Sequence, residues 1–134
     1  SYPNGAGNSS QWTRSTGADQ WATIDEALFD GGTDYNLSTA ATVKDTLAFP
    51  NAPVAAVPIL AVQLNMMMEK ADAGASGIKA VTRIGGTDYL GTEIFPPAGY
   101  YDLRQIWDVK PSDSVAWSDT DFNAAEFGYI RSTS

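Results

Sequence analysis

The residues that could do chemistry in this chain are carboxylates and tyrosines, because its 134 residues include no histidine and no cysteine. The most common general base, the Ser-His and Cys-His nucleophile pairs, disulfides and thiolate metal sites are therefore excluded. Asp25 and Glu26 are adjacent, so in a strand they would point to opposite faces and would not form a glycosidase pair by themselves. This composition favours a binding or structural protein over an enzyme.

Other carboxylates lie in stretches expected to form loops, where oxygen ligands can bind calcium. They are Asp30, Asp34, Asp72, Asp119 and Asp121. Their spacing does not match a calcium-binding loop, and solvated turns and helix caps explain these residue types. The glycine pairs precede expected strands rather than helices, so they do not predict a phosphate site. We expect neither a metal nor another cofactor.

Four tyrosines near expected turns could stack on sugar rings, as exposed aromatic residues do in many lectins. They are Tyr35, Tyr89, Tyr100 and Tyr101. Packing between strands at the ends of a sheet is the alternative that we favour.

The charge of the chain limits its partners. The formal net charge is -8, and an acidic surface repels phosphate, so we expect no nucleic-acid partner. The sequence contains no apolar run of the length that a membrane-spanning helix needs, so we expect no membrane partner. Acidic charge also keeps identical copies soluble before they assemble.

A five-residue repeat indicates the elements that must position these residues. The sequence Gly-Gly-Thr-Asp-Tyr occupies residues 31–35 and again residues 85–89. Glycine pairs supply the positive φ angles of tight hairpins, and threonine and tyrosine favour strands. We expect strands at residues 20–27, 35–37, 42–49, 59–68, 77–84, 92–95, 100–109 and 127–131. This pattern predicts one all-β domain, a β-sandwich of the jelly-roll type.

The strand expected at residues 59–68 has the clearest alternation of apolar and polar residues. One face comprises Leu60, Val62, Leu64, Met66 and Met68, which we expect in the core. Met67 then lies outside beside Gln63 and Asn65, and these three residues are candidates for a contact surface. In the strand at residues 100–109, the residues expected to face inward are Tyr101, Leu103, Trp107 and Val109.

One short helix is expected near residues 118–125. Ser118 is a suitable N-cap, and Asp121 lies three positions later, which is the spacing of a capping box. Trp117 and Phe122 stand where a hydrophobic staple would place them.

Residues 1–19 are predicted to form an extended N-terminal arm, and residues 20–134 the sandwich domain. The arm is rich in serine and glycine, which is typical of a disordered tail. However, Tyr2, Trp12 and Arg14 are residue types enriched at protein interfaces. We therefore expect residues 1–15 to be mobile in the free protein and to become ordered on a partner.

A series of short motifs extends over residues 11–130. It includes the run from Gln20-Trp21 through Asp25-Glu26, then Thr33-Asp34-Tyr35, Lys44-Asp45-Thr46, residues 61–65, Asp72-Ala73-Gly74, Arg83, residues 86–89, Ala116-Trp117 and residues 123–128. In order and spacing they resemble a family of small virion structural proteins of tailed, often marine, bacteriophages. The sequence departs from the expected pattern at residues 66–68, where we expect alternating polar and basic residues instead of three methionines.

This resemblance implies a non-enzymatic particle component, similar to head decoration or cement proteins. Such a protein would be made in the host cytoplasm and would bind the outer surface of the assembled head. Its expected partners are the major capsid protein and further copies of itself, for example in a trimer. The alternative is a tail or fibre module that binds host-surface glycans.

Overall fold

The computed structural model describes residues 1–26, 28–71 and 73–132. The order of elements is β1 (Gly5–Ser10), β2 (Thr13–Arg14), the 3-10 helix η1 (Trp21–Thr23), β3 (Asn36–Leu37), β4 (Lys44–Ala48), β5 (Val62–Met68), β6 (Ile78–Ile84), β7 (Thr87–Leu90), β8 (Tyr101–Trp107), α1 (Asp119–Ala124) and β9 (Glu126–Arg131).

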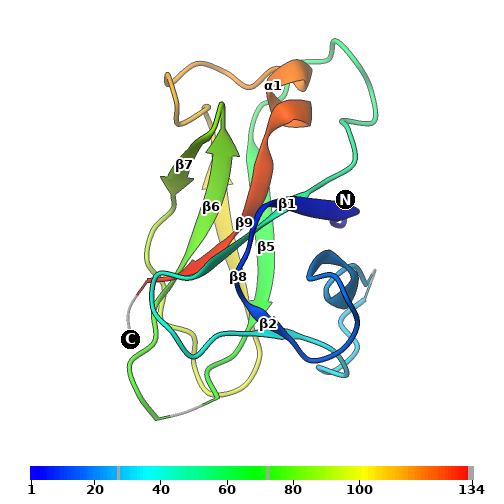
Figure 1. Ribbon diagram of the computed structural model, residues 1–134. Coiled ribbons are helices and arrows are strands. Elements are labelled where there is room, and N and C mark those ends of the chain that lie inside the picture. The colour runs from blue at the N-terminus through cyan, green and yellow to red at the C-terminus, as the bar shows by residue number, and fades with distance from the viewer. Residues whose placement is uncertain (27, 72, 133–134) are drawn as a thin grey trace.

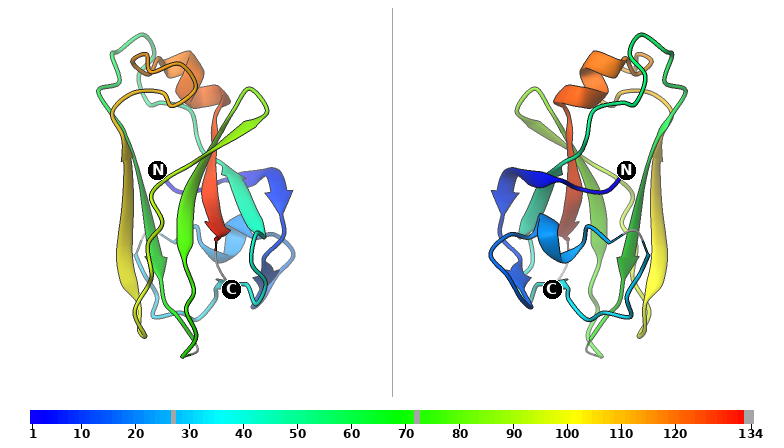
Figure 2. Two further views of the ribbon diagram at one scale, coloured as in Figure 1. Left: turned by 90° about the vertical axis from the view of Figure 1, so that its left-hand side faces the viewer. Right: turned by 90° about the vertical axis from the view of Figure 1, so that its right-hand side faces the viewer.

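The strands form two facing layers, as the views along the sheets show (Figures 1 and 2). One layer is an antiparallel sheet in the order β1-β4-β9-β6-β7, and the other is the antiparallel pair β5-β8. A small third pair, β2-β3, flanks them. The expected all-β sandwich is confirmed. Its main layers have five strands and two, whereas a jelly roll has eight strands in its two sheets.

The core joins the two layers around Phe127 of β9, which is 3% exposed. Its ring lies 6.0 Å from that of Trp107 on β8 and 5.9 Å from that of Phe49. Trp117 and Phe122, at the start of α1, pack against the same ring at 6.1 and 5.7 Å. Because aromatic rings bury large apolar areas, the contact of Trp107 with Phe127 helps to join the two layers, together with the buried Val62, Met66 and Leu103.

The alternation expected along β5 is confirmed for most of its length. Val62 and Met66 are buried, Leu64 and Met68 pack against the core, and Met67 is 44% exposed. Leu60 is 86% exposed, so its expected place in the core is wrong. The strand begins only at Val62, because Ile59 and the residues around it follow Pro58 and make a single bridge to Trp117.

Strand β8 is also shorter than expected. Leu103 and Trp107 face the core as expected. Tyr101 lies on the same face as Leu103 but is 56% exposed, and Val109 is 43% exposed, so neither belongs to the core. Val109 lies beyond the end of the strand, and Tyr101 lies at its first position. Residues 92–95 do not form the expected strand, because only Ile94 pairs there, in one bridge to Ile78.

The two copies of the glycine repeat adopt different structures. Gly85 and Gly86, at φ 57° and 84°, form the expected two-residue hairpin between β6 and β7. Gly31 and Gly32 also have positive φ, but their loop joins no strands, so the first expected hairpin is wrong. The Asp30 carboxylate accepts hydrogen bonds from the Gly32 and Thr33 amides, which favours a local turn over strand pairing.

The strand expected at residues 20–27 is wrong, and residue 27 lies outside the described residues. Residues 21–23 form η1 instead. The Thr23 hydroxyl donates to the Gln20 carbonyl over 2.8 Å, and the Gln20 side chain donates to the Trp12 carbonyl over 2.9 Å. These bonds turn the chain back toward the N-terminal segment, so its alternating pattern has no neighbouring strand to pair with.

The N-terminal segment is extended, as expected, but it does not lie apart from the sandwich. Strand β1 pairs antiparallel with β4, from Gly5 opposite Ala48 to Ser10 opposite Asp45, with a bulge between Ala6 and Ser10. Residues 5–10 are thus an edge strand of the five-stranded sheet. This arrangement contradicts the expectation of a mobile arm, because the backbone of β4 already supplies its hydrogen-bond partners.

Candidate functional site

A buried polar network fixes the N-terminal segment and is the most enclosed group of polar side chains described. Asp45 is 0% exposed. One of its carboxylate oxygens accepts hydrogen bonds from the amides of Gln11 and Trp12, at 2.6 and 2.9 Å. The other accepts from the Tyr129 hydroxyl at 3.2 Å. All of these partners belong to the chain itself, so the network has a structural role.

Tyr129 is held in this network by burial and by two neighbours. Its hydroxyl also accepts from the Asn36 amide group at 2.9 Å. Burial first, and the adjacent Asp45 carboxylate second, raise the pKa of Tyr129 well above its ordinary value. The hydroxyl therefore stays protonated and donates to Asp45 over the whole physiological range.

The expected partner anchors of the N-terminal segment differ in their surroundings. The Trp12 indole N–H donates to the Val43 carbonyl at 3.1 Å, and its ring packs edge-on against Tyr129 at 4.7 Å. Trp12 is thus half-buried within the protein, which overturns its expected availability as an anchor. Tyr2 is 49% exposed and Arg14 is also exposed.

The first candidate site is the outer face of the two-stranded layer, called here the β5–β8 outer face. It comprises Gln63, Asn65, Met67, Asp102, Arg104 and Ile106, all of them exposed. The register of the pair sets these residues opposite one another, as Gln63–Ile106, Asn65–Arg104 and Met67–Asp102. The three candidates expected on β5 are therefore brought together on one face, beside the β8 residues that the sequence did not single out.

The second candidate site is a group of aromatic rings and carboxylates, called here the aromatic–acidic cluster. Its members are Glu26, Phe29, Asp30, Asp34, Tyr35 and Tyr100. They line one part of a broad cavity of about 1160 Å³, whose lining also includes core residues and Gln63, Asn65 and Met67 of β5. The rings of Phe29 and Tyr100 meet edge to face at 4.6 Å. Two of the four tyrosines expected to bind sugars, Tyr35 and Tyr100, thus line a common cavity, whereas Tyr89 and Tyr101 do not line it.

The carboxylates of this cluster lie close enough to repel one another. The ligand oxygens of Glu26, Asp30 and Asp34 all lie within 4.8 Å of one another, close enough to hold one hard cation. Desolvation first, and then the charges of Asp34 and Asp30, raise the pKa of Glu26. Desolvation, followed by the charge of Glu69, likewise raises the pKa of Tyr100.

Most of this cluster lies within residues 26–35, and Tyr100 comes from a distant part of the chain. Sequence reasoning names four of its members separately, pairs Glu26 only with Asp25 and misses Phe29. The sequence does not show that Tyr100 approaches the first glycine repeat, where a side chain at Gly32, which has a φ of 80°, would overlap the Tyr100 hydroxyl.

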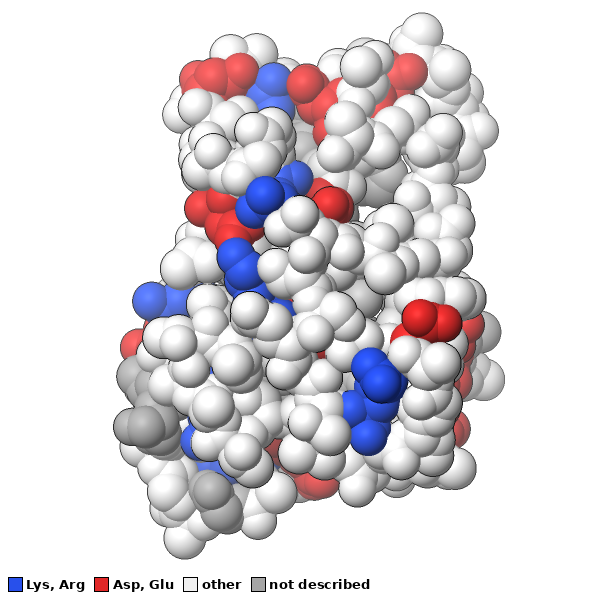
Figure 3. Space-filling view, viewed as in Figure 1, with Lys and Arg blue, Asp and Glu red and all other residues white. Residues whose placement is uncertain are grey.

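Of the remaining expected carboxylates, Asp72 lies outside the described residues, and Asp119 accepts a hydrogen bond from the distant Ala56 amide at 3.0 Å. Asp121 accepts from the Ser118 hydroxyl at 2.7 Å and pairs with Lys110 at 3.1 Å. These hydrogen bonds, that from Ser118 above all, lower the pKa of Asp121. On the face seen in Figure 3, basic side chains lie beside acidic ones. Asp88 contacts both Lys44 and Arg83.

Comparisons with known proteins identify no relative of this chain. No protein-family model matches the chain, and searches of curated proteins and of solved structures find no significant match. Among the described residues, none of the helices has the length and apolar character that crossing a membrane would require.

Proposed function

We propose that this chain is a non-enzymatic structural protein of a phage virion, which decorates the outer surface of the assembled head and stabilises it. The motif resemblance over residues 11–130 supports this proposal, as does the net charge of -8, which suits the outside of a DNA-filled shell. Its partners are the major capsid protein and further copies of this chain.

One structural observation carries the choice of contact surface. On the β5 half of the β5–β8 outer face, Gln63, Asn65 and Met67 form an exposed row without charge, and the other face of this strand is packed into the core. The row lies beside the Asp102–Arg104 ion pair of β8. Interfaces deplete charged residues at their centres and favour methionine. Because Trp12 packs within the protein, the proposed capsid contact is this row and not the N-terminal segment.

The test is occupancy on purified heads that lack their native decoration protein. Gln63→Glu places a charge in the row, opposite the uncharged Ile106, and is expected to lower occupancy at least tenfold. Ser112→Glu adds the same charge at an exposed turn and serves as the matched control. Equal occupancy of the two variants would remove the β5–β8 outer face from the proposal, and failure of the unchanged protein to bind heads would remove the decoration role.

The aromatic–acidic cluster favours a second candidate function, a tail or fibre module that binds host-surface glycans. Aromatic rings can stack on sugar rings, and carboxylates accept hydrogen bonds from sugar hydroxyls. Binding on a glycan array should be lost in the Tyr35→Ala, Tyr100→Ala double variant and kept in Tyr101→Ala, which lies outside the cluster. An array with no bound glycan would count against this function.

A further inference from the structure

The β5–β8 layer has an open edge along β8. Among the residues that the structure describes, β5 and β8 pair only with each other. In the described parts of the chain, the backbone of residues 101–105 makes no hydrogen bond beyond that pairing. A seven-residue strand with such an edge is a template for another strand.

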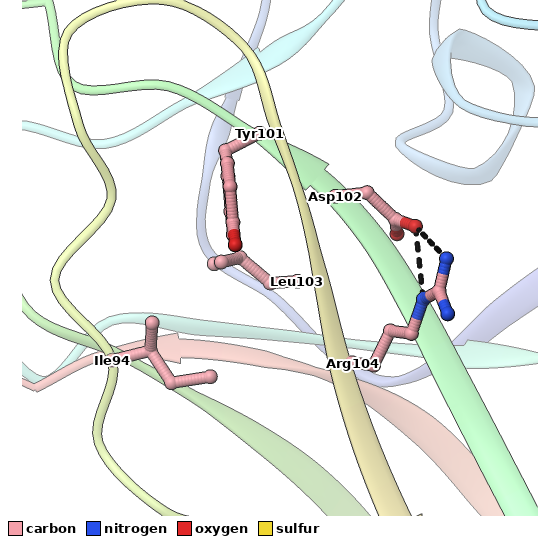
Figure 4. Close-up of a pocket in the computed structure, with 5 residues that line it drawn as sticks. All are labelled: Ile94, Tyr101, Asp102, Leu103 and Arg104. Atoms are coloured by element: carbon pink, nitrogen blue, oxygen red, sulfur yellow. Dashed lines mark hydrogen bonds and ion pairs between the residues drawn. The ribbon is translucent and has the colours of Figure 1, made fainter.

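A shallow groove follows this edge. Its volume is about 590 Å³, and it is lined by Ile94, Tyr101, Asp102, Leu103 and Arg104 (Figure 4). Figure 4 shows the ring of Tyr101 and the side chain of Leu103 on one side of the strand and the charged side chains on the other. Tyr101, an exposed aromatic residue, therefore lies at the start of the edge, and the oppositely charged Asp102 and Arg104 lie near its middle.

The two charges on β8 lie two residues apart on the same face. Arg104 donates to the Asp102 carboxylate at 2.7 and 2.9 Å, and both side chains are well exposed. In a chain with a net charge of -8, this is a locally neutral and self-complementary segment. Such a pattern suits a second copy of the same strand running in the opposite direction.

We propose that two copies of this chain pair through antiparallel β8 strands, around a two-fold axis at Leu103. The two β5–β8 layers then form one continuous four-stranded sheet. This register sets Asp102 opposite Arg104 of the second copy, twice. The proposal is argued from this edge alone, although Asp102 and Arg104 also belong to the β5–β8 outer face.

The charges select this register over its neighbours. In one continuous sheet, residues that lie opposite each other on the two β8 strands must point to the same face. The two-fold axis must therefore pass through a residue, and alternative registers place it at a neighbouring residue. An axis at Asp102 would set two aspartates opposite each other, and an axis at Arg104 would set two arginines opposite each other. Like charges directly opposite destabilise a sheet, whereas opposite charges stabilise it. Only the axis at Leu103 among these three pairs unlike charges.

A two-fold pair differs from the trimer that the resemblance implies. An isologous pair uses the same patch on both copies, and a trimer needs two different patches. The mass of the assembly in solution distinguishes the two, measured by sedimentation equilibrium over a series of protein concentrations.

A charge exchange tests the register. Asp102→Arg sets two arginine pairs across the axis and is expected to raise the dimer dissociation constant at least tenfold. The double variant Asp102→Arg, Arg104→Asp restores unlike pairs and should recover the dimer. Asp19→Arg makes the same charge change at an exposed site away from β8 and should leave the dissociation constant unchanged.

Circular dichroism shows whether each variant is folded, so loss of dimer is separated from loss of structure. A monomer at every soluble concentration would overturn the proposal. A trimer would also overturn it, as would a dimer that Asp102→Arg leaves unchanged. Loss of the dimer without recovery in the double variant would overturn the register.

Discussion

At the scale of single residues, Asp45 decides how the N-terminal segment is attached. Its carboxylate is fully buried and accepts hydrogen bonds from two backbone amides and one tyrosine hydroxyl. A buried charge is tolerated only when its hydrogen-bonding capacity is used. The sequence showed Asp45 only as part of a strand, because nothing in the spacing of residues 11, 12, 45 and 129 indicates that they meet.

Replacing Asp45 by asparagine should destabilise the protein by about 1–3 kcal/mol. The amide keeps one oxygen as an acceptor, but its NH₂ group replaces the oxygen that accepts from the Tyr129 hydroxyl. The hydroxyl proton then loses its acceptor in the core. Urea unfolding followed by tryptophan fluorescence measures the change. Asp108→Asn, at an exposed position, is the control and should change the stability by less than about 0.5 kcal/mol.

The Glu26 carboxylate should make stability depend on pH. Its pKa is raised in the folded protein, so its contribution to stability is fully present below its ordinary value of 4.5. That contribution is lost as the pH rises through the raised pKa. Glu26→Gln is therefore expected to stabilise the protein by about 0.2–1 kcal/mol at neutral pH. The gain should disappear in acid, and Asp19→Asn should show no such change. A loss of stability at neutral pH would contradict repulsion in the aromatic–acidic cluster.

At the scale of elements, the short helix was predictable because its signal is local. The Ser118 hydroxyl accepts from the Asp121 amide at 3.0 Å, and the Asp121 carboxylate accepts from the Ser118 amide at 3.3 Å. Both partners lie within four residues, so their spacing alone indicates the capping box. The same holds for the hairpin at residues 85–86 and for the alternation along β5.

Ser118→Ala should cost about 1 kcal/mol, because it removes an acceptor that caps the first turn of α1. Thr120→Ala, exposed within the same helix, should have a much smaller effect. Thermal unfolding of the two variants measures the difference. The Asp121 part of the cap is lost as the pH falls, since its pKa is lowered in the folded protein. Equal stability of the two variants would show that the cap contributes little.

The elements that were not predictable depend on distant partners. Strand β1 has the composition of a tail, and it is a strand because β4 offers it an edge. The sequence of residues 20–27 alternates as a strand does, yet residues 21–23 form a 3-10 helix beside the hydrogen bonds of the Gln20 and Thr23 side chains. The first copy of the glycine repeat does not form a hairpin, because the Asp30 carboxylate accepts hydrogen bonds from the Gly32 and Thr33 amides.

Deleting residues 1–12 should destabilise the sandwich by more than about 3 kcal/mol. The deletion removes β1 from the edge of β4 and leaves the buried Asp45 carboxylate without its two amide donors. Deleting only residues 1–2 leaves these contacts in place and is the control. Urea unfolding of the two truncated proteins measures the difference in the free energy of unfolding. If the protein without residues 1–12 were as stable as the full chain, the N-terminal segment would contribute nothing to the stability of the sandwich.

At the scale of the whole molecule, the two layers are held by different means. In the five-stranded sheet, β4, β9 and β6 each have a neighbour on both sides. Strands β5 and β8 have only each other and the core around Phe127. A two-stranded sheet is marginal by itself, so its stability depends on that packing. The surface proposed for binding thus lies on the layer with fewer backbone hydrogen bonds.

Hydrogen exchange should separate these layers. In the monomer, amides of β9 and β6 should exchange only when the whole protein unfolds, whereas those of β5 and β8 should exchange through a smaller opening of lower free energy. At protein concentrations where β8 strands pair, the amides along the β8 edge should gain protection in the unchanged protein. In Asp102→Arg they should not, because the paired state is lost. Equal protection of both layers in the monomer would show that the sandwich opens as one unit. Protection of β8 that is independent of concentration would count against pairing at its edge.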